Sequence, residues 1–254
     1  MKEHVILLIT NRQEEDIIVR HIMSKCNITE EFNVWSYSAS LMKLYNWIYD
    51  VDGKEVEKCQ FINVFRKQEK SVKYKVLCQQ NFTEIILSYD LSDLDYDDDK
   101  EKIYKLLKYF NNIRKNGKLF INYPTIEAFY HTEEFHKGDF ENREIGEKDI
   151  SVDSYRMIVG GEIGFPDWNM YNEDIIYELM KRNLKKCYNI ISKQCWPNRE
   201  QEDYRSIIDF AIIFKKQIKH FHNNEKMPIL CTSLCIPLEI LGVKKRVLLE
   251  LFKE

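Results

Sequence analysis

An apolar run in this chain breaks off into a series of carboxylates. Residues 85–87 have the composition of a buried strand, and six aspartates follow within ten residues, beginning with Asp90. Carboxylates at the carboxyl end of a parallel strand are the groups with which α/β folds commonly hold a divalent cation. Residues 97–99 are better explained as loop and helix-capping aspartates. For Asp90, metal binding and a strand-terminating turn are the two alternatives.

Alternating strand and helix patterns surround this acidic run. Such alternation is typical of a parallel sheet with helices on both faces, and it predicts an α/β fold. Residues 54–80 fit no single pattern: 60–66 could form a strand, and 71–80 a helix or a strand. Buried strands are predicted at 5–9, 32–37, 85–89 and 118–122, and helices at 17–22, 41–49, 100–113 and 125–131.

The second half of the chain has a different character. Residues 132–154 are charged and irregular, and an apolar segment at 228–237 precedes a last short helix near the C-terminus. Between them, two long helical patterns are predicted at 172–194 and 203–221. We therefore expect an α/β core over residues 1–131 and a mainly helical region over 132–254. This region should pack on the sheet without folding independently.

Composition and charge narrow the class of protein. At 254 residues and 44% hydrophobic content, the chain can bury a sizeable core. Its net charge of −3 gives no general attraction to nucleic acid, so any such binding would need a local basic patch. The seven cysteines form no C-x-x-C pair, which favours reduced thiols. No run is long enough for a signal peptide or a membrane span, so we expect a cytoplasmic protein without membrane contact.

Acidic side chains follow three of the predicted strands. Because the loops after parallel strands gather along one edge of a sheet, we expect these side chains to converge. A few such carboxylates could hold Mg²⁺ or Mn²⁺, which stabilises charge on a phosphate and lowers the pKa of a bound water. The acids and one amide are Glu14, Glu15 and Asp16 after the first strand, Asp90, Asp93 and Asp95 after the third, and Asn122 and Glu127 after the fourth.

This arrangement resembles the Toprim catalytic domain, in which a Glu follows the first strand and an Asp-x-Asp pair follows a later one. The closer resemblance is to the Toprim-like RloB and abortive-infection proteins of bacterial phage defence. In those proteins the acidic strand end is followed by Asn-Pro-x-x-Glu, an aromatic residue and a His. Residues 122–131 here are Asn-Tyr-Pro-Thr-Ile-Glu-Ala-Phe-Tyr-His, one residue longer between Asn and Pro. The resemblance spans residues 5–131.

The chain departs from the Toprim pattern at two places. Thr-Asn at residues 10–11 replaces the usual Glu-Gly. Glu14 or Glu15 would therefore have to supply this acid from the next turn. Ser92 stands where the second Asp is expected, and Asp93 lies one place later. A hydroxyl is a poorer ligand than a carboxylate for a hard cation. These departures leave two alternatives, a metal site of weaker affinity and a degenerate one.

The resemblance implies a metal-dependent phosphodiesterase that cleaves DNA or RNA. It further implies the effector subunit of a bacterial anti-phage system, working with an ATPase partner, and a homodimer is an option because Toprim-like proteins often dimerise. The alternative function is a catalytically degenerate Toprim-like module that binds a partner ATPase or an effector. An enzyme acting on a phosphate-containing small molecule is a third option.

Individual residues receive roles from the same resemblance. Asn122 could bridge neighbouring strand ends through its amide. His131 could contact a phosphate or move a proton, and a buried or surface imidazole is its alternative. The remaining roles are the metal ligands Asp90, Asp93 and Asp95 and the catalytic acids Glu14, Glu15 and Glu127.

Basic side chains recur at helical spacing in the second half. Lys181, Arg182, Lys185 and Lys186 form one stripe, and the lysines of residues 215–219 form another. Surface helices show such stripes routinely, and a phosphate-binding track is the functional alternative. The chain has no Walker A motif, G-x-S-x-G elbow or His-Glu-x-x-His zinc motif.

Overall fold

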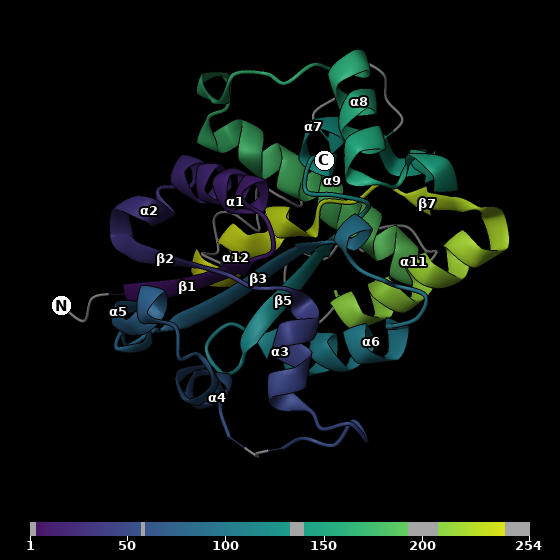
Figure 1. The fold of residues 1–254 in the computed structure, drawn as a ribbon. Helices are drawn as coiled ribbons and strands as arrows, with labels where there is room; N and C mark the ends of the chain where they lie inside the picture. Colours follow the sequence, from purple (N-terminus) through teal and green to yellow (C-terminus); the bar gives the residue numbers. More distant parts are fainter. Residues whose placement is uncertain (1–3, 57–58, 133–139, 193–207, 242–254) are drawn as a thin grey trace.

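A five-stranded sheet with helices on both faces forms the centre of the protein (Figure 1). The computed structural model describes residues 4–56, 59–132, 140–192 and 208–241. Four strands run parallel in the order β2-β1-β3-β5, and β4 pairs antiparallel with β5 at one edge. The predicted α/β fold is therefore confirmed. The strands are β1 (His4–Thr10), β2 (Phe32–Ser38), β3 (Glu84–Asp90), β4 (Asn111–Asn112) and β5 (Gly117–Asn122).

The central strands are apolar because helices cover both of their faces. Every residue of β3 is buried, as is every residue of β5, whereas the edge strand β2 is mostly half-buried or exposed. A strand covered on both sides needs a continuous apolar run rather than alternation. This requirement explains why the continuous apolar runs in the sequence predicted the positions of these strands correctly.

The order of the connections places a crevice beside β1 and β3. Helix α1 (Gln13–Lys25) leads from β1 outward to β2, and the chain then returns across β1 to reach β3. Figure 1 shows α1 on one side of the sheet, with α3 (Leu41–Ile48) and α6 (Lys100–Tyr109) on the other. The loops after β1 and β3 therefore leave in opposite directions. Open α/β sheets bind ligands at such a switch point, beyond the carboxyl ends of the strands.

The segment between β2 and β3 is helical. Phe61, Val64 and Phe65 are buried at the i, i+3 and i+4 spacing of one helix face, so the strand considered for residues 60–66 is wrong. For residues 71–80, the helical alternative is correct. The elements here are α4 (Phe61–Gln68), a 3₁₀ turn (Val72–Tyr74) and α5 (Lys75–Cys78), and the short α2 (Ile28–Glu31) precedes β2.

The second half is mainly helical, and it adds a small antiparallel pair of strands that the sequence did not predict. Residues 193–194 and 203–207 of the two predicted long helices lie outside the described residues. The elements are α7 (Ala128–Thr132), β6 (Glu144–Gly146), α8 (Val152–Glu162), α9 (Glu173–Ser192), α11 (Phe210–Asn224), β7 (Lys226–Pro228) and α12 (Ile236–Leu241).

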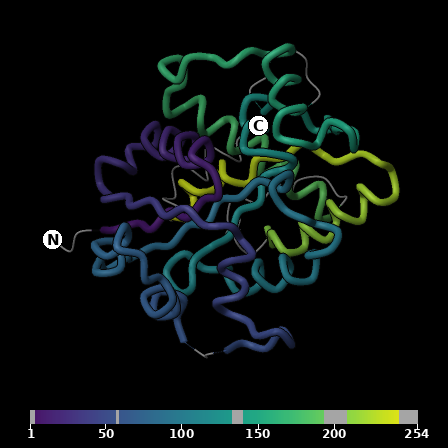
Figure 2. The backbone as a smooth tube through the Cα atoms, viewed as in Figure 1, coloured from purple at the N-terminus to yellow at the C-terminus, as the bar shows by residue number. Residues whose placement is uncertain are grey.

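The segment after β7 packs on the sheet. Tyr123 and Leu230 exchange two backbone hydrogen bonds of 2.8 Å, and Thr232 Oγ1 donates to the Ile121 carbonyl at 2.9 Å. Figure 2 shows this last described segment, in yellow, against the blue and teal strands of the sheet. A buried ion pair between Lys118 of β5 and Glu239 of α12 adds a further link. The helical region and the sheet thus share contacts at the centre of the fold.

Two sequence expectations bear on the environment of the protein. In residues 4–56, 59–132, 140–192 and 208–241, no helix is both long enough and apolar enough to cross a bilayer. The cysteines of the described ranges carry free thiols, and Cys195 lies outside them. The free cysteines are Cys26, Cys59, Cys78, Cys187, Cys231 and Cys235.

Candidate metal centre

Glu15 is held at the start of α1 by three backbone amides. Its Oε2 accepts hydrogen bonds from the N–H groups of Asn11 at 2.7 Å and Arg12 at 2.9 Å. Its Oε1 accepts from the N–H of Asp90 at 2.9 Å. The first turn of a helix leaves N–H groups unpaired, and an acid at its third residue commonly satisfies them. Here the same side chain also joins α1 to the end of β3.

Asp90 occupies the last position of β3 and is fully buried. It lies opposite Asn122 in the register of β3 and β5. Its Oδ1 accepts hydrogen bonds from the N–H of Ile126 at 2.7 Å and from Asn122 Nδ2 at 3.2 Å. Asn122 therefore bridges neighbouring strand ends through its amide, as expected from the sequence.

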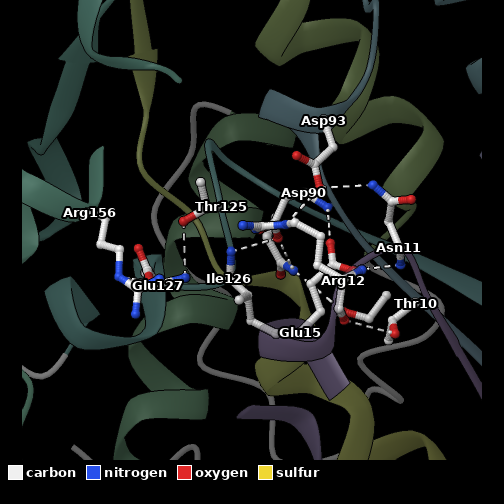
Figure 3. A network of polar contacts seen from close by, with 12 residues as sticks. Thr10, Asn11, Arg12, Glu15, Asp90, Asp93, Thr125, Ile126, Glu127 and Arg156 are labelled. Atoms are coloured by element: carbon white, nitrogen blue, oxygen red, sulfur yellow. Dashed lines mark hydrogen bonds and ion pairs between the residues drawn. The ribbon is translucent and has the colours of Figure 1, made fainter. Parts of the chain in front are cut away.

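Asp93 completes an acidic cluster with Glu15 and Asp90. It ends the 3₁₀ turn after β3, and its Oδ2 accepts from Asn11 Nδ2 at 3.2 Å. One oxygen from each of the three carboxylates lies within 4.8 Å of the others (Figure 3). Oxygens bound to one Mg²⁺ at about 2.1 Å stand at most about 4.2 Å apart. The spacing of the three oxygens is therefore close to that of an occupied site, and oxygen donors suit a hard cation.

Arg12 places its guanidinium among these carboxylates. Its Nη2 contacts Asp90 Oδ2, and its Nε lies 2.8 Å from Asp93 Oδ2. Figure 3 shows this side chain extending between the two aspartates. The sequence analysis missed Arg12 and its neighbour Asn11. A basic residue in the loop directly after the first strand, next to the predicted acids, was the available signal.

The cluster holds more acid than Arg12 neutralises. Burial raises the pKa of Glu15 to about 7, against the opposing effect of the Arg12 and Asn11 amides. Burial also raises the pKa of Asp90 well above its ordinary value, and the charge of Glu15 adds to this shift. Buried like charges disfavour joint ionisation unless a cation compensates them. A bound proton or a metal cation would each relieve this repulsion.

Glu14, Asp16 and Asp95 are not among the three acids of the cluster, and Asp16 pairs with Arg20 instead. Glu14 is exposed on α1, beside Glu15. Asp95 is exposed in the loop before α6, where its Oδ1 accepts from the N–H of Asp98 at 3.3 Å. Ser92, the residue at the predicted second-Asp position, donates its N–H to the Pro124 carbonyl at 3.1 Å. The roles proposed for Glu14 and Asp95 remain predictions.

Glu127 lies near the cluster but is not one of its three acids. It is 6% exposed and follows Ile126, whose N–H holds Asp90. Its Oε1 lies 3.5 Å from Arg156 Nε, and its buried Oε2 has no hydrogen-bond partner among the described residues. Burial raises the pKa of Glu127, and the positive charges of Arg156 and Arg12 oppose this shift. Its predicted role as a supporting acid stays a prediction.

His131 is a buried imidazole. Its Nδ1 is hydrogen-bonded to the Tyr155 hydroxyl, and its Nε2 lies 3.3 Å from Glu162 Oε2. Burial lowers the pKa of His131 to about 3, and the charges of Arg143 and Lys186 contribute. The ring is therefore neutral at physiological pH. Of the alternatives for His131, a buried imidazole agrees with these surroundings better than a phosphate contact does.

The pH dependence of stability should carry a contribution from His131. Since an exposed imidazole titrates near pH 6.5, the unfolded chain binds one more proton than the folded protein between about pH 6.5 and pH 3. From this residue alone, the free energy of unfolding falls by up to about 1.4 kcal/mol for each pH unit below about 6.5. We expect His131→Gln to flatten the slope between about pH 6.5 and 5, as measured by urea unfolding. Parallel slopes for the two proteins would contradict the assignment.

The basic stripes of α9 and α11 are used within the fold. Lys186 is 2% exposed and donates to the carbonyls of Phe140 at 2.7 Å and Arg143 at 2.8 Å. Lys216 donates to the Ile191 carbonyl at 2.5 Å. These contacts give Lys186 and Lys216 a structural role, and a phosphate-binding track along the rest of the two stripes stays a prediction.

Two tryptophans of the second half, Trp168 and Trp196, could pack in the core or stack on nucleic-acid bases, and the sequence favours a core role for both. Trp168 is half-buried and stacks on His21 at a centroid distance of 4.6 Å, in agreement with a packing role. Trp196 lies outside the described residues.

Comparison with known proteins identified no relative of this chain. No family model matches the chain, and no similar curated protein or solved structure was found. The structure by itself therefore defines an α/β fold with a buried acidic cluster that could bind a metal ion.

Proposed function

We propose that this protein is a metal-dependent phosphodiesterase of the Toprim-like type that acts on DNA or RNA. The observation that supports the proposal most strongly is the convergence of Glu15, Asp90 and Asp93 within 4.8 Å. These acids come from the ends of β1 and β3, at the switch point where open α/β sheets bind ligands.

The residues of the site divide the chemistry between them. Glu15, Asp90 and Asp93 would hold Mg²⁺ or Mn²⁺, which stabilises charge on a phosphate and lowers the pKa of a bound water. Glu127 would support the site, because it follows Ile126, whose N–H holds Asp90. Asn122 fixes the orientation of Asp90 through its amide.

The biological setting is proposed from the resemblance of residues 5–131 to the RloB and abortive-infection proteins. We infer an effector subunit of a bacterial anti-phage system, controlled by an ATPase partner. A homodimer is consistent with the same resemblance. An ATPase that restrains a nuclease would explain why the isolated chain could be silent in a cleavage assay.

A second candidate function is a catalytically degenerate module that binds a partner ATPase or an effector. The position of Arg12 favours it, since a guanidinium in contact with Asp90 and Asp93 can serve as a permanent counter-ion. Ser92 in place of the second Toprim aspartate points the same way. In this case the three acids would stabilise the loops after β1 and β3 and would bind no metal.

Metal binding and cleavage together test the proposal. Calorimetric titration with Mn²⁺ comes first, because binding does not require release from a partner. End-labelled single- and double-stranded DNA and RNA are then incubated with the protein in Mn²⁺ or in EDTA. We expect saturable Mn²⁺ binding and cleavage that EDTA abolishes, with both reduced in Asp93→Asn. A folded protein that binds no Mn²⁺ would favour the degenerate module.

A further inference from the structure

The guanidinium of Arg12 stands where a cation would bind. It contacts Asp90 and lies 2.8 Å from Asp93, the two aspartates of the acidic cluster. A metal ion bound by both carboxylates would compete with Arg12 for the same oxygens and would repel its positive charge. Metal entry therefore requires the guanidinium to move, and its side chain is 23% exposed, so one side of it is free of packing.

Glu127 offers the displaced guanidinium a second partner. Its carboxyl is 6% exposed, and its buried Oε2 has no partner among the described residues. Its other oxygen is 3.5 Å from Arg156, a side chain that is half exposed to solvent. The charge of Arg12 already acts on Glu127 from its present position. Figure 3 shows Glu127 and Arg156 together, on the far side of Ile126 from Asp93.

We propose that Arg12 moves between two carboxylate sites: it pairs with Asp90 and Asp93 without metal, and with Glu127 once a metal ion is bound. This inference rests on the proposed metal site. In the exchange, the metal replaces the guanidinium at the aspartates, while the guanidinium reaches a buried carboxylate oxygen that has no partner among the described residues. Arg12 is then a positioning residue that couples metal entry to Glu127.

A double-mutant cycle on Mn²⁺ affinity tests this coupling in the full chain. The proteins are the wild type, Arg12→Gln, Glu127→Gln and the double variant, each titrated by calorimetry. Arg12→Gln should tighten binding about tenfold, since the competing cation is gone. Glu127→Gln should weaken binding by about fivefold, since the displaced guanidinium loses its partner. In the Arg12→Gln background, Glu127→Gln should change the affinity very little.

Arg156→Gln is the matched control. It removes the other cation beside Glu127, so it should not weaken Mn²⁺ binding. A second measurement avoids any folding defect of the variants: the Nε–H resonance of Arg12 in the wild type is followed by NMR during titration with diamagnetic Mg²⁺. This resonance should shift with the same midpoint as metal binding, and a resonance that stays fixed while Mg²⁺ binds would overturn the proposal.

The remaining outcomes separate the two proposals. Glu127→Gln could weaken Mn²⁺ binding equally in the wild type and in the Arg12→Gln background. Glu127 would then be a ligand of the metal itself, and the exchange would be overturned. Tight binding by the wild type that is unaffected by Glu127→Gln would overturn the exchange and leave the metal site intact. Absence of Mn²⁺ binding in both the wild type and Arg12→Gln would overturn the proposed function, with Arg12 as a permanent counter-ion.

Discussion

The substitution Asp90→Asn is expected to raise the dissociation constant for Mn²⁺ at least about 100-fold. Loss of a group that merely orients a metal ligand typically costs about 10–100-fold in affinity, so loss of a buried ligand should cost no less. The substitution keeps an oxygen that can accept from Ile126 and Asn122. It replaces the second oxygen with an amide that can neither bind a cation nor accept from Arg12.

The control for this substitution is Asp98→Asn. It makes the same change of charge in the same acidic run, on an exposed side chain outside the cluster. We expect its Mn²⁺ affinity to equal that of the wild type, as measured by calorimetry. Thermal melts of both variants would show whether a fold defect accounts for any loss. If Asp90→Asn bound Mn²⁺ as the wild type does, the acidic cluster would not be a metal site. The same titration of Asp95→Asn decides whether that predicted ligand contributes.

The second large effect is expected at the ion pair between β5 and α12. Lys118 and Glu239 have side chains that are 9% and 5% exposed, so little solvent screens their attraction. Removing one partner of a buried pair typically costs about 3–5 kcal/mol of stability. We therefore expect Lys118→Met to lower the free energy of unfolding by about that amount, as measured in urea.

The double variant Lys118→Met/Glu239→Leu serves as the control. Well-packed apolar residues often replace a buried pair without loss, so the double variant should recover most of the stability. A single cooperative transition in all three proteins would support a helical region that does not fold independently of the sheet. If the free energy of unfolding of Lys118→Met lay within about 1 kcal/mol of the wild-type value, water or other groups would already compensate the charge of Glu239.

The strands and the position of Asp90 could be predicted because one requirement governs both. A parallel strand covered on two faces must be continuously apolar, and the first charged residue then marks its end. The residues 60–66 were harder, because a short apolar segment satisfies the periods of both a strand and a helix. Burial of Phe61, Val64 and Phe65 on one face of the segment decides for the helix.

The composition of the acidic cluster could be predicted only in part. Glu14 and Glu15 are equivalent in sequence, since both favour the first turn of a helix. They differ because α1 begins at Gln13, which places Glu15 where its side chain can return to the amides of Asn11 and Arg12. Arg12 could not be assigned in advance because its contacts are to residues about 80 positions later in the chain. Pairing over such distances depends on the register of β1 and β3.

The amide of Asn122 also determines when the cluster can be completed. Its Nδ2 donates to Asp90, and its Oδ1 accepts from the backbone N–H of Ser233 at 3.1 Å. The ribosome makes Glu15, Asp90 and Asp93 long before it makes Ser233. The full set of hydrogen bonds around Asp90 and Asn122 can therefore form only after residue 233 has been synthesised. A nascent chain that ends before Ser233 carries all three acids without this support for Asn122, so the helical region takes part in the final geometry of the centre.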